Sequence, residues 1–299
     1  MISAPLELRR SRPVVLGAEG RAGAAMAEVL SAHAPQTVAA GRFEIDVCDY
    51  FQMCGELERL EADLVINAVG WADVDSCETD PARSRLLNAE VAGQMARAAH
   101  GAGARFVHLS SDYVFDGAGG APYDESAEPN PLSVYGQDKR EGERLVLENH
   151  PEALILRTAW LFGGHGRRPD FVTSVLSAAL AGTTIPVVRD QVGCPTGVGE
   201  LARGLVDLLA VGAMGLVHLT GAGGVSRADF ARAILDEARR FDVEIEPVLS
   251  DSMAQRARRP ADSRLDTSLF SRLTGAPPRP WLEGLREALA LRRQESAGL

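Results

Sequence analysis

Short apolar runs alternate with longer amphipathic stretches along the first half of the chain. Five runs have the length and composition of buried strands, at 14–16, 37–40, 64–67, 106–109 and 154–156. Three stretches between them repeat apolar residues at helical spacing, at 26–32, 82–99 and 136–148. Because strands that alternate with helices form βαβ units, the pattern predicts an α/β fold with a doubly wound parallel sheet of the Rossmann type.

After residue 158 the alternation weakens, although helical periodicity continues at 171–181, 198–209, 227–240 and 281–291. We therefore predict a smaller, mainly helical C-terminal lobe that contributes the substrate site. We expect residues 1–12 to form a loose leader. The predicted Rossmann domain comprises 13–157 with parts of 188–220 and 278–295, and the predicted substrate lobe comprises 158–187 with 221–277.

The composition is that of an ordinary globular protein, and its charge argues against some partners. The 299 residues are 45% hydrophobic and 24% charged. There are 41 acidic and 31 basic residues, which give a net charge of -10. Nucleic acids and anionic membranes are bound through clustered positive charge, so we expect neither as a partner. The apolar run at 14–16 is too short for a signal sequence or a membrane span, which favours the cytoplasm.

Two details of the composition bear on chemistry. The four cysteines form no CxxC pair and lie at no zinc-finger spacing from a histidine, so we interpret them as reduced thiols. Thirty of the 31 basic residues are arginine, and Lys139 is the only lysine. In a chain that uses arginine almost everywhere, this exception favours a specific use for an ammonium group at position 139, with chance as the alternative.

A glycine-rich turn follows the first predicted strand and precedes a helix. Gly17, Gly20 and Gly23 have the spacing G-x-x-G-x-x-G. In dinucleotide-binding folds such glycines permit the tight turn, the approach of the backbone to the pyrophosphate, and close packing of the helix. We assign these glycines, with Arg21 between them, to a cofactor site, although a glycine-rich connection without a ligand has the same pattern.

The end of the second strand indicates which dinucleotide binds. It carries no acid for the ribose 2′-hydroxyl of NAD, and Arg42 follows it, so the sequence predicts NADPH. A solvated surface arginine is the alternative. Asp46 and Val47 suit the edge and face of the adenine. Asn67 and Ala68 close the third strand at the same edge of the sheet, although ordinary loop capping would also explain these residues.

Tyr135 and Lys139 form a Y-x-x-x-K pair, one turn apart on a predicted helix. An ammonium beside a phenol lowers the pKa of the phenol, and the pair then acts as an acid and base. A surface pair without a catalytic role is the alternative. Ser111 ends the fourth strand at the same crevice and is placed to bond a substrate carbonyl. His108, inside that strand, is interpreted as a packed core residue.

With these residues the chain resembles the dTDP-4-dehydrorhamnose reductase family, a group of extended short-chain dehydrogenase/reductases that reduce sugar-nucleotide 4-ketones. The resemblance spans nearly the whole chain after the leader. It rests on the glycine turn, Asp46 with Asp49, Asn67, Val74-Asp75, Asn88, residues 110–115, Tyr135 to Lys139, residues 157–160, Asp190-Gln191, residues 195–197, Arg259-Pro260 and residues 263–265.

The resemblance implies that Ser111, Tyr135 and Lys139 are the catalytic triad, with Tyr135 and Lys139 also at the cofactor. Asp112 and Trp160 would contact the deoxysugar, and Trp71 departs from the family pattern in a way that reshapes the sugar pocket. Family members that form a metal-bridged dimer have an acid where this chain has Gly199, so we predict no metal.

The implied reaction is the NADPH-dependent reduction of the C4 ketone of a dTDP-4-keto-6-deoxyhexose. Two alternatives stay open: a sugar-nucleotide epimerase, and a non-catalytic NADP-binding regulatory subunit like that of methionine adenosyltransferase. A homodimer is an open expectation. Arg167 or Arg168 is a candidate contact for the substrate diphosphate, with a solvated loop as the alternative.

Overall fold

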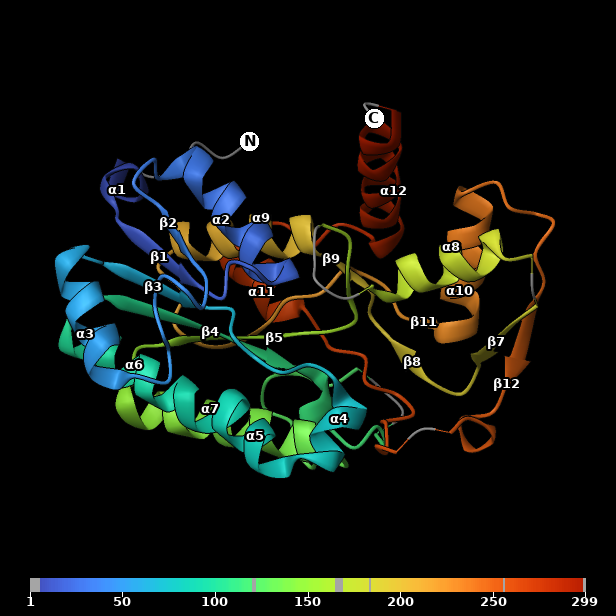
Figure 1. The fold of residues 1–299 in the computed structure, drawn as a ribbon, viewed down its shortest axis with the longest axis horizontal. Coiled ribbons are helices and arrows are strands. Elements are labelled where there is room, and N and C mark those ends of the chain that lie inside the picture. Colours follow the sequence, from blue (N-terminus) through green and yellow to red (C-terminus); the bar gives the residue numbers. More distant parts are fainter. Residues whose placement is uncertain (1–5, 120–121, 165–168, 183, 255, 298–299) are drawn as a thin grey trace.

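The computed structural model describes residues 6–119, 122–164, 169–182, 184–254 and 256–297. Its centre is a parallel sheet of six strands in the order β10-β5-β4-β3-β1-β2 (Figure 1). These strands are β1 Pro13–Leu16, β2 Val38–Ala40, β3 Leu64–Asn67, β4 Arg105–Ser111, β5 Leu154–Thr158 and β10 Gly215–His218. The parallel sheet and its strand order confirm the predicted Rossmann type.

The register of the sheet gathers the candidate residues at one edge. Leu16 pairs with Asn67, and Asn67 pairs with His108. One strand further on, Ser111 pairs with Thr158. Three segments therefore lie next to one another at the carboxyl edge of the sheet: the glycine turn after β1, the loop after β3 and the end of β4. Folds of this type bind their ligands at this edge.

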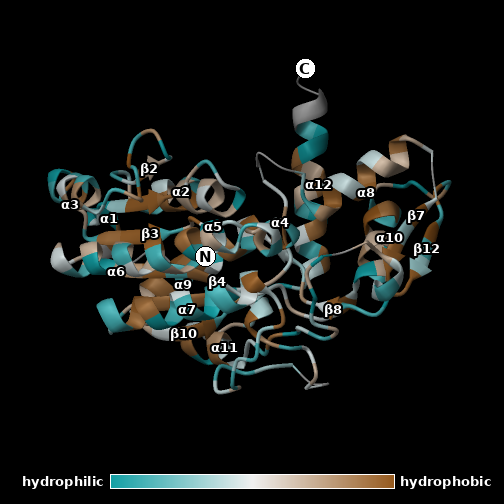
Figure 2. Cartoon of the chain, turned by 60° about the horizontal axis from the view of Figure 1, so that its bottom comes forward, coloured by the Kyte–Doolittle hydropathy of each residue, from teal (hydrophilic) through white to brown (hydrophobic). Residues whose placement is uncertain are grey.

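Helices cover both faces of this sheet, and Figure 2 shows its hydrophobic strands between two helical layers. One apolar cluster joins one face to α2 Arg21–His33, α9 Val198–Ala210 and α11 Ser268–Thr274. The other joins the opposite face to α3 Tyr50–Arg59, α6 Val91–Gly101 and α7 Val134–Asn149. Strands buried on both faces explain why the apolar runs are continuous rather than alternating.

Short elements form the loops at the carboxyl edge. After β3 come α4 Val74–Thr79, α5 Pro81–Arg85 and the π-helical turn η1 Leu86–Glu90, which leads into α6. The 3-10 turn η2 Asp112–Val114 follows β4 directly. π-helical turns are rare and are frequent at functional sites, and the sequence pattern did not predict this one.

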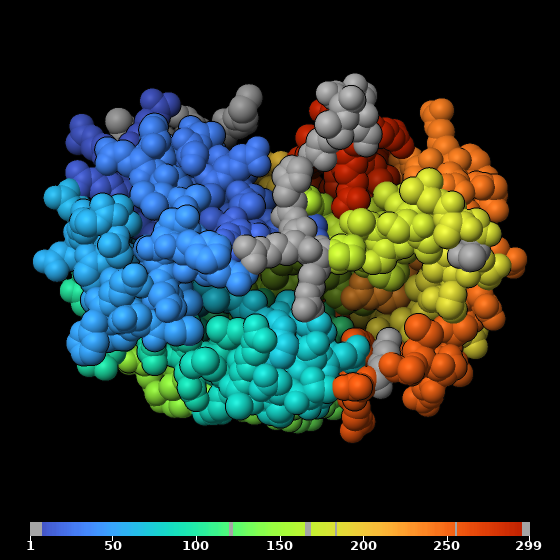
Figure 3. Space-filling model, in the orientation of Figure 1, coloured from blue at the N-terminus to red at the C-terminus, as the bar shows by residue number. Residues whose placement is uncertain are grey.

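The C-terminal lobe packs around its own apolar cluster, which includes Phe162 and Phe230. Its helices are α8 Phe171–Leu180, α10 Arg227–Glu237 and α12 Trp281–Ala297, with the 3-10 turn η3 Ser250–Ser252. Three two-stranded sheets accompany them: β7 Ile185–Val188 with β12 Ile245–Val248, β8 Val192–Gly193 with β11 Val225–Ser226, and β6 Leu161–Phe162 with β9 Thr196–Gly197. In the space-filling view of Figure 3, the first half of the chain lies mainly on the left and this lobe lies on the right.

Two predicted boundaries differ from the structure. Within the predicted leader, Leu6–Arg10 form helix α1 and Leu8 is buried in the core of the sheet domain. Helix α11 also packs on that core through Phe270, whereas α12 places Leu285 in the core of the lobe. The sequence analysis placed α11 in the substrate lobe and α12 in the Rossmann domain. Helical periodicity does not reveal which core an apolar face enters.

Candidate active site

The structure brings Ser111, Tyr135 and Lys139 together at the junction of β4 and α7. Helix α7 begins at its N-cap Ser133, whose hydroxyl accepts from the Gly136 N–H. A Cβ on Gly136 would lie 2.1 Å from the carbonyl oxygen of Tyr113, so only glycine permits this approach of α7 to η2. Tyr135 lies near enough to Ser111 for the serine hydroxyl to lower the pKa of the phenol.

Burial controls the acidity of Tyr135. It raises the pKa of the phenol above its usual value, and the hydrogen bond with Ser111 acts in the opposite direction without reversing the shift. The sequence predicts a lowered pKa, whereas in this structure desolvation of the phenolate is the largest influence and raises it. A raised pKa keeps the phenol protonated, which suits a proton donor.

Lys139 follows Tyr135 by one turn of α7 and is buried, with 4% of its surface exposed. Its ammonium donates to the carbonyl oxygen of Leu109, in β4. Burial lowers the pKa of Lys139 to about 8, and nearby Glu143 acts against that shift. Glu143 in turn accepts from Ser110 at 2.5 Å and pairs with the Arg157 guanidinium at 2.7 and 2.8 Å. A buried ion pair thus fixes α7 against β4 and β5.

Asp112 lies next to Ser111 and is 2% exposed. One carboxylate oxygen accepts from Ser111 Oγ at 3.0 Å, and the other accepts from Ser263 Oγ at 2.6 Å. Burial raises the pKa of Asp112 to about 6, although both serine hydroxyls act to lower it. Ser263 comes from a distant part of the sequence. It belonged to a motif of the resemblance but had no assigned role.

The glycine turn has the geometry expected of a phosphate site. Gly17 has φ +83, and a Cβ there would lie 2.9 Å from the Val69 nitrogen. A Cβ on Gly23 would lie 2.3 Å from the Gly17 carbonyl oxygen, so this glycine allows α2 to pack close to β1. The N-terminus of α2 has no side-chain cap from Gly20 and no acid in its first turn. Its N–H groups and dipole therefore suit an anion.

The two arginines assigned to the cofactor hold protein partners in this structure. Arg21 reaches the lobe, where it donates to Asp170 at 3.0 Å and to the Gly163 carbonyl at 2.6 Å. Its side chain ties the two parts of the molecule together, which the sequence did not predict. Arg42 is largely exposed and lies 3.3 Å from Glu19, in the glycine turn. Its contact with a 2′-phosphate stays a prediction.

The remaining cofactor candidates surround the same turn. Asp46 accepts from the Cys48 N–H at 2.9 Å, as in ordinary loop capping, and Val47 packs against the sheet core. Asn67 Nδ2 lies 3.0 Å from a ring nitrogen of His108, which is buried as predicted. The Ala68 N–H donates to Leu16 and places its loop against Gly17. These positions are compatible with a cofactor and do not require one.

The two tryptophans assigned to the substrate are each covered by an arginine. Arg227 stacks on Trp160 at 3.5 Å from the ring centroid, and a Cβ on Gly193 would lie 2.4 Å from the same ring. Trp160 adopts φ +45, a conformation that is unusual for a bulky residue and often marks a functional site. Trp71, in the loop after β3, lies 4.8 Å from Arg83.

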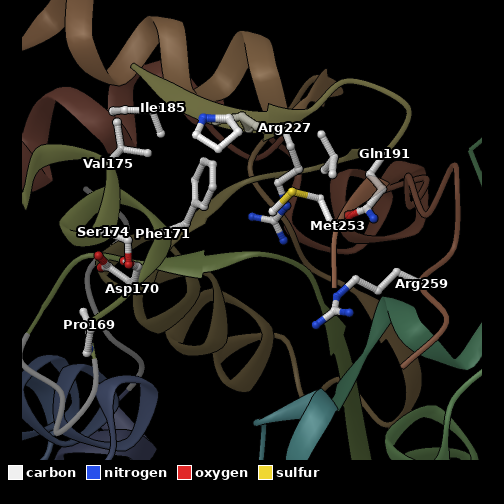
Figure 4. Close-up of a pocket in the computed structure, with 13 residues that line it drawn as sticks. Pro169, Asp170, Phe171, Ser174, Val175, Ile185, Gln191, Arg227, Met253 and Arg259 are labelled. Atoms are coloured by element: carbon white, nitrogen blue, oxygen red, sulfur yellow. The ribbon is translucent and has the colours of Figure 1, made fainter. Parts of the chain in front are cut away.

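A cavity of about 430 Å³ opens in the lobe and is lined in part by Arg227 (Figure 4). Its apolar wall comes from α8 and β7, and Arg227 and Arg259 supply positive charge. Tyr113 is a hydrogen-bond partner of both arginines, and Asp75 pairs with Arg259 at 2.9 Å. The sequence named Asp75 and Arg259 only as motif members, and Arg227 was missed because nothing in its local pattern marks it.

Other predictions concern metals, membranes and one loop. Within the described part of the chain, no cluster of three or more His, Cys, Asp or Glu residues is arranged to hold a metal ion. Beside Gly199, the Arg203 guanidinium pairs with Glu287 at 2.9 Å. Among the described helices, none is both long and apolar enough to cross a membrane. Arg167 and Arg168 lie outside the described residues.

Comparison with known proteins identifies the family. The family model described as the RmlD substrate binding domain matches residues 12–293. A dTDP-4-dehydrorhamnose reductase of Mycolicibacterium smegmatis is 33% identical, over 96% of this chain and 88% of that protein. A dTDP-4-keto-6-deoxy-D-glucose reductase of Streptomyces niveus is 32% identical, over 94% and 97%. The crystal structure of a Bacillus anthracis dTDP-4-dehydrorhamnose reductase in complex with NADP is 29% identical and superposes with a TM-score of 0.89, over 94% of this chain and 99% of that one. The chain belongs to the dTDP-4-dehydrorhamnose reductase family.

Proposed function

We propose that the protein reduces the C4 ketone of a dTDP-4-keto-6-deoxyhexose with NADPH. The observation that carries this proposal is the position of the Ser111–Tyr135 pair. The two hydroxyls lie at the carboxyl edge of the sheet, and the glycine turn lies at the same edge. The cavity lined by Arg227 and Arg259 lies in the lobe. A ketone bound between a nicotinamide and these hydroxyls is in reach of both hydride and proton.

The residues present fit a dinucleotide phosphate. The uncapped N-terminus of α2 suits its pyrophosphate, and Arg42 suits its 2′-phosphate. The B. anthracis relative binds NADP, which supports the same cofactor here. Bound NADPH supplies the hydride, and the protein supplies position and electrostatics.

The catalytic residues then have separate roles. Tyr135, kept protonated by burial, donates its proton to the developing alkoxide. Lys139 bonds the nicotinamide ribose and places a positive charge beneath the phenol. Ser111 holds the carbonyl beside Tyr135. In this structure its hydroxyl donates to Asp112, so it must turn toward the substrate in order to polarise the ketone.

The cavity of the lobe suits the nucleotide part of the substrate. Arg227 and Arg259 lie where their guanidinium groups bond a diphosphate, and Phe171 and Val175 offer apolar surface to a pyrimidine (Figure 4). Trp160 stacks against Arg227, which lines this cavity. The relatives named for two different dTDP-keto sugars are 33% and 32% identical to this chain. Overall similarity therefore does not select the sugar.

The test is NADPH oxidation in the presence of a dTDP-4-keto-6-deoxyhexose, with the sugar product identified. We expect Tyr135→Phe to lose roughly 10²–10⁴-fold in turnover while NADPH still binds, because the proton donor is gone. Near-normal turnover in that variant would contradict the assignment. Conversion of the sugar without net NADPH oxidation indicates an epimerase, and NADPH binding without any conversion indicates a regulatory subunit.

We also propose that the enzyme acts in the cytoplasm. The four cysteines are free in the structure, as a reducing compartment requires. A homodimer stays a prediction, and sedimentation equilibrium of the purified chain tests it.

A further inference from the structure

Arg21 extends from the glycine turn into the substrate lobe. It is the first residue of α2, directly after Gly20, and its backbone belongs to the helix N-terminus that suits a pyrophosphate. Its Nη1 atom donates to Asp170 Oδ2 at 3.0 Å and to the carbonyl oxygens of Gly163 and Gly164 at 2.6 and 3.3 Å. The side chain is 16% exposed. One residue therefore joins the turn proposed to bind the cofactor to the lobe that carries the cavity.

The lobe forms a site whose shape and charge suit a guanidinium group. Gly163 and Gly164 follow each other at φ +82 and +61, a conformation that residues with a Cβ rarely adopt. A Cβ on Gly164 would also lie 2.9 Å from Val198 Cγ2, so this turn packs closely against α9. Asp170 lies beside the turn and accepts from the Gly163 N–H at 2.7 Å. Two carbonyls and a carboxylate thus bind the same cation.

Asp170 is ionised although its side chain is only 2% exposed. Burial raises the pKa of this carboxyl, but the hydrogen bonds from Thr173 and from the Gly163 N–H, together with the charge of Arg21, outweigh burial and hold the pKa below its usual value. A buried carboxylate that loses one of its charged partners is poorly compensated. We therefore expect a change at Arg21 to disturb Asp170 as well.

Asp170 also determines where α8 begins, and α8 forms one wall of the cavity. Its side chain caps the helix by accepting from an N–H group of the first turn at 2.6 Å. Three residues from the first turns of α8 line the cavity: Phe171, Ser174 and Val175. Figure 4 shows Asp170 on one side of the cavity and Arg259 on the other. The position of Asp170 therefore affects the wall that a bound nucleotide would contact.

We propose that Arg21 is a positioning residue for the substrate cavity and that it makes binding at the cofactor and substrate sites cooperative. A dinucleotide bound by the N–H groups of α2 fixes the turn that carries Arg21. Arg21 then holds Asp170 and the start of α8 in place, so the nucleotide sugar meets a preorganised wall and binds more tightly. This role rests on the proposed function and goes beyond it, because it makes substrate affinity depend on a residue of the cofactor turn.

Calorimetric titration with dTDP, without and with saturating NADP⁺, tests this proposal. For the wild-type protein we expect NADP⁺ to lower the dissociation constant of dTDP by at least about fivefold, and dTDP to tighten NADP⁺ by the same factor, because coupling is reciprocal. Arg21→Gln should bind dTDP equally in both conditions, no more tightly than the wild-type protein without NADP⁺. Arg21→Lys should recover part of the coupling, since a single nitrogen makes the three contacts with the lobe.

Arg292→Gln is the matched control. Arg292 belongs to α12 of the lobe, and its guanidinium lies 3.4 Å from the other carboxylate oxygen of Asp170. This variant removes a guanidinium from the same carboxylate and leaves the cofactor turn intact, so NADP⁺ should still tighten dTDP by the wild-type factor. Asp170→Asn removes the acceptor of the pair, should lose the coupling, and serves if Arg21→Gln is unstable.

Three results would overturn the proposal. The first is a wild-type affinity for dTDP that does not depend on NADP⁺. The second is full coupling in Arg21→Gln or Asp170→Asn. The third is an equal loss of coupling in Arg292→Gln, which would mean that any change around Asp170 has this effect. If the wild-type protein binds no dTDP at all, the proposed function itself fails.

Discussion

The part of the site proposed to be catalytic and the part proposed to face the substrate are held in place by different kinds of contact. Around Tyr135 and Lys139, α7 contacts its neighbours through backbone atoms. Gly136 lies against the Tyr113 carbonyl, and Gly142 lies against the Asn88 carbonyl of η1. Across the seam with the lobe, long arginine side chains make the contacts instead. Arg259 reaches Asp75 and Arg21 reaches Asp170 across this seam, and within the lobe Arg227 covers Trp160.

This difference separates two tasks. Backbone contacts have few degrees of freedom, so they keep the hydroxyls in place for a reaction that depends on fractions of an ångström. A guanidinium on a flexible chain exchanges one partner for another at little cost, which suits a surface that must release protein contacts when a charged ligand enters. We therefore expect changes in the first part to reduce turnover, and changes in the second part to alter affinity.

Among changes that test this difference in packing, the largest effect is expected from Gly136→Ala. The new Cβ would lie 2.1 Å from a backbone oxygen that cannot move aside alone, so α7 must shift and carry Tyr135 with it. A displacement of about 1 Å reduces turnover roughly 100-fold. The measurement is kcat with saturating substrates, alongside the NADPH dissociation constant.

Gly55→Ala is the matched control for this prediction. Gly55 lies within α3, and a Cβ there would meet no atom within 4 Å. Because alanine favours helix over glycine, this variant should be unchanged in kcat and stabilised by about 0.5–1 kcal/mol. Equal kcat values for the two variants would mean that the close approach at Gly136 does not position the tyrosine.

A smaller effect is expected from Arg227→Gln, in the substrate-facing part. Loss of a charge-assisted bond to a diphosphate costs about 1.5–3 kcal/mol, so the dissociation constant of dTDP should rise roughly tenfold to a hundredfold. NADPH affinity should not change. Calorimetric titration with each ligand measures both values. Arg232→Gln, an exposed position on the same helix, is the control, and an equal loss in both variants would contradict the proposed diphosphate site.

The same contrast explains how far the sequence predicted the structure. Local rules predict the sheet, the order of strands and helices along the chain, and the trio proposed to be catalytic: continuous apolar strands, a glycine turn, and a helical spacing of four. The lobe is assembled from separate segments, so Ser263 reaches Asp112 and Arg259 reaches Asp75 across 151 and 184 positions. No local pattern encodes such distant pairings. Tertiary packing also determines the π-helical turn, the cores that α11 and α12 pack against, and the raised pKa of Tyr135.

The smallest effect is expected at Glu19, which is paired with Arg42 at the edge of the cofactor site. The two side chains lie 3.3 Å apart, and the Arg42 side chain is 61% exposed. If Arg42 binds the 2′-phosphate as proposed, NADPH draws it away from Glu19, and an exposed ion pair of this kind is worth about 0.2–1 kcal/mol. Glu19→Gln should therefore tighten NADPH binding by up to roughly fivefold and leave NADH little changed, whereas Arg42→Gln should weaken NADPH selectively. Fluorescence titration with both nucleotides measures these changes. If Arg42→Gln weakens NADPH and NADH equally, Arg42 does not read the 2′-phosphate, and the preference for NADPH must come from another residue.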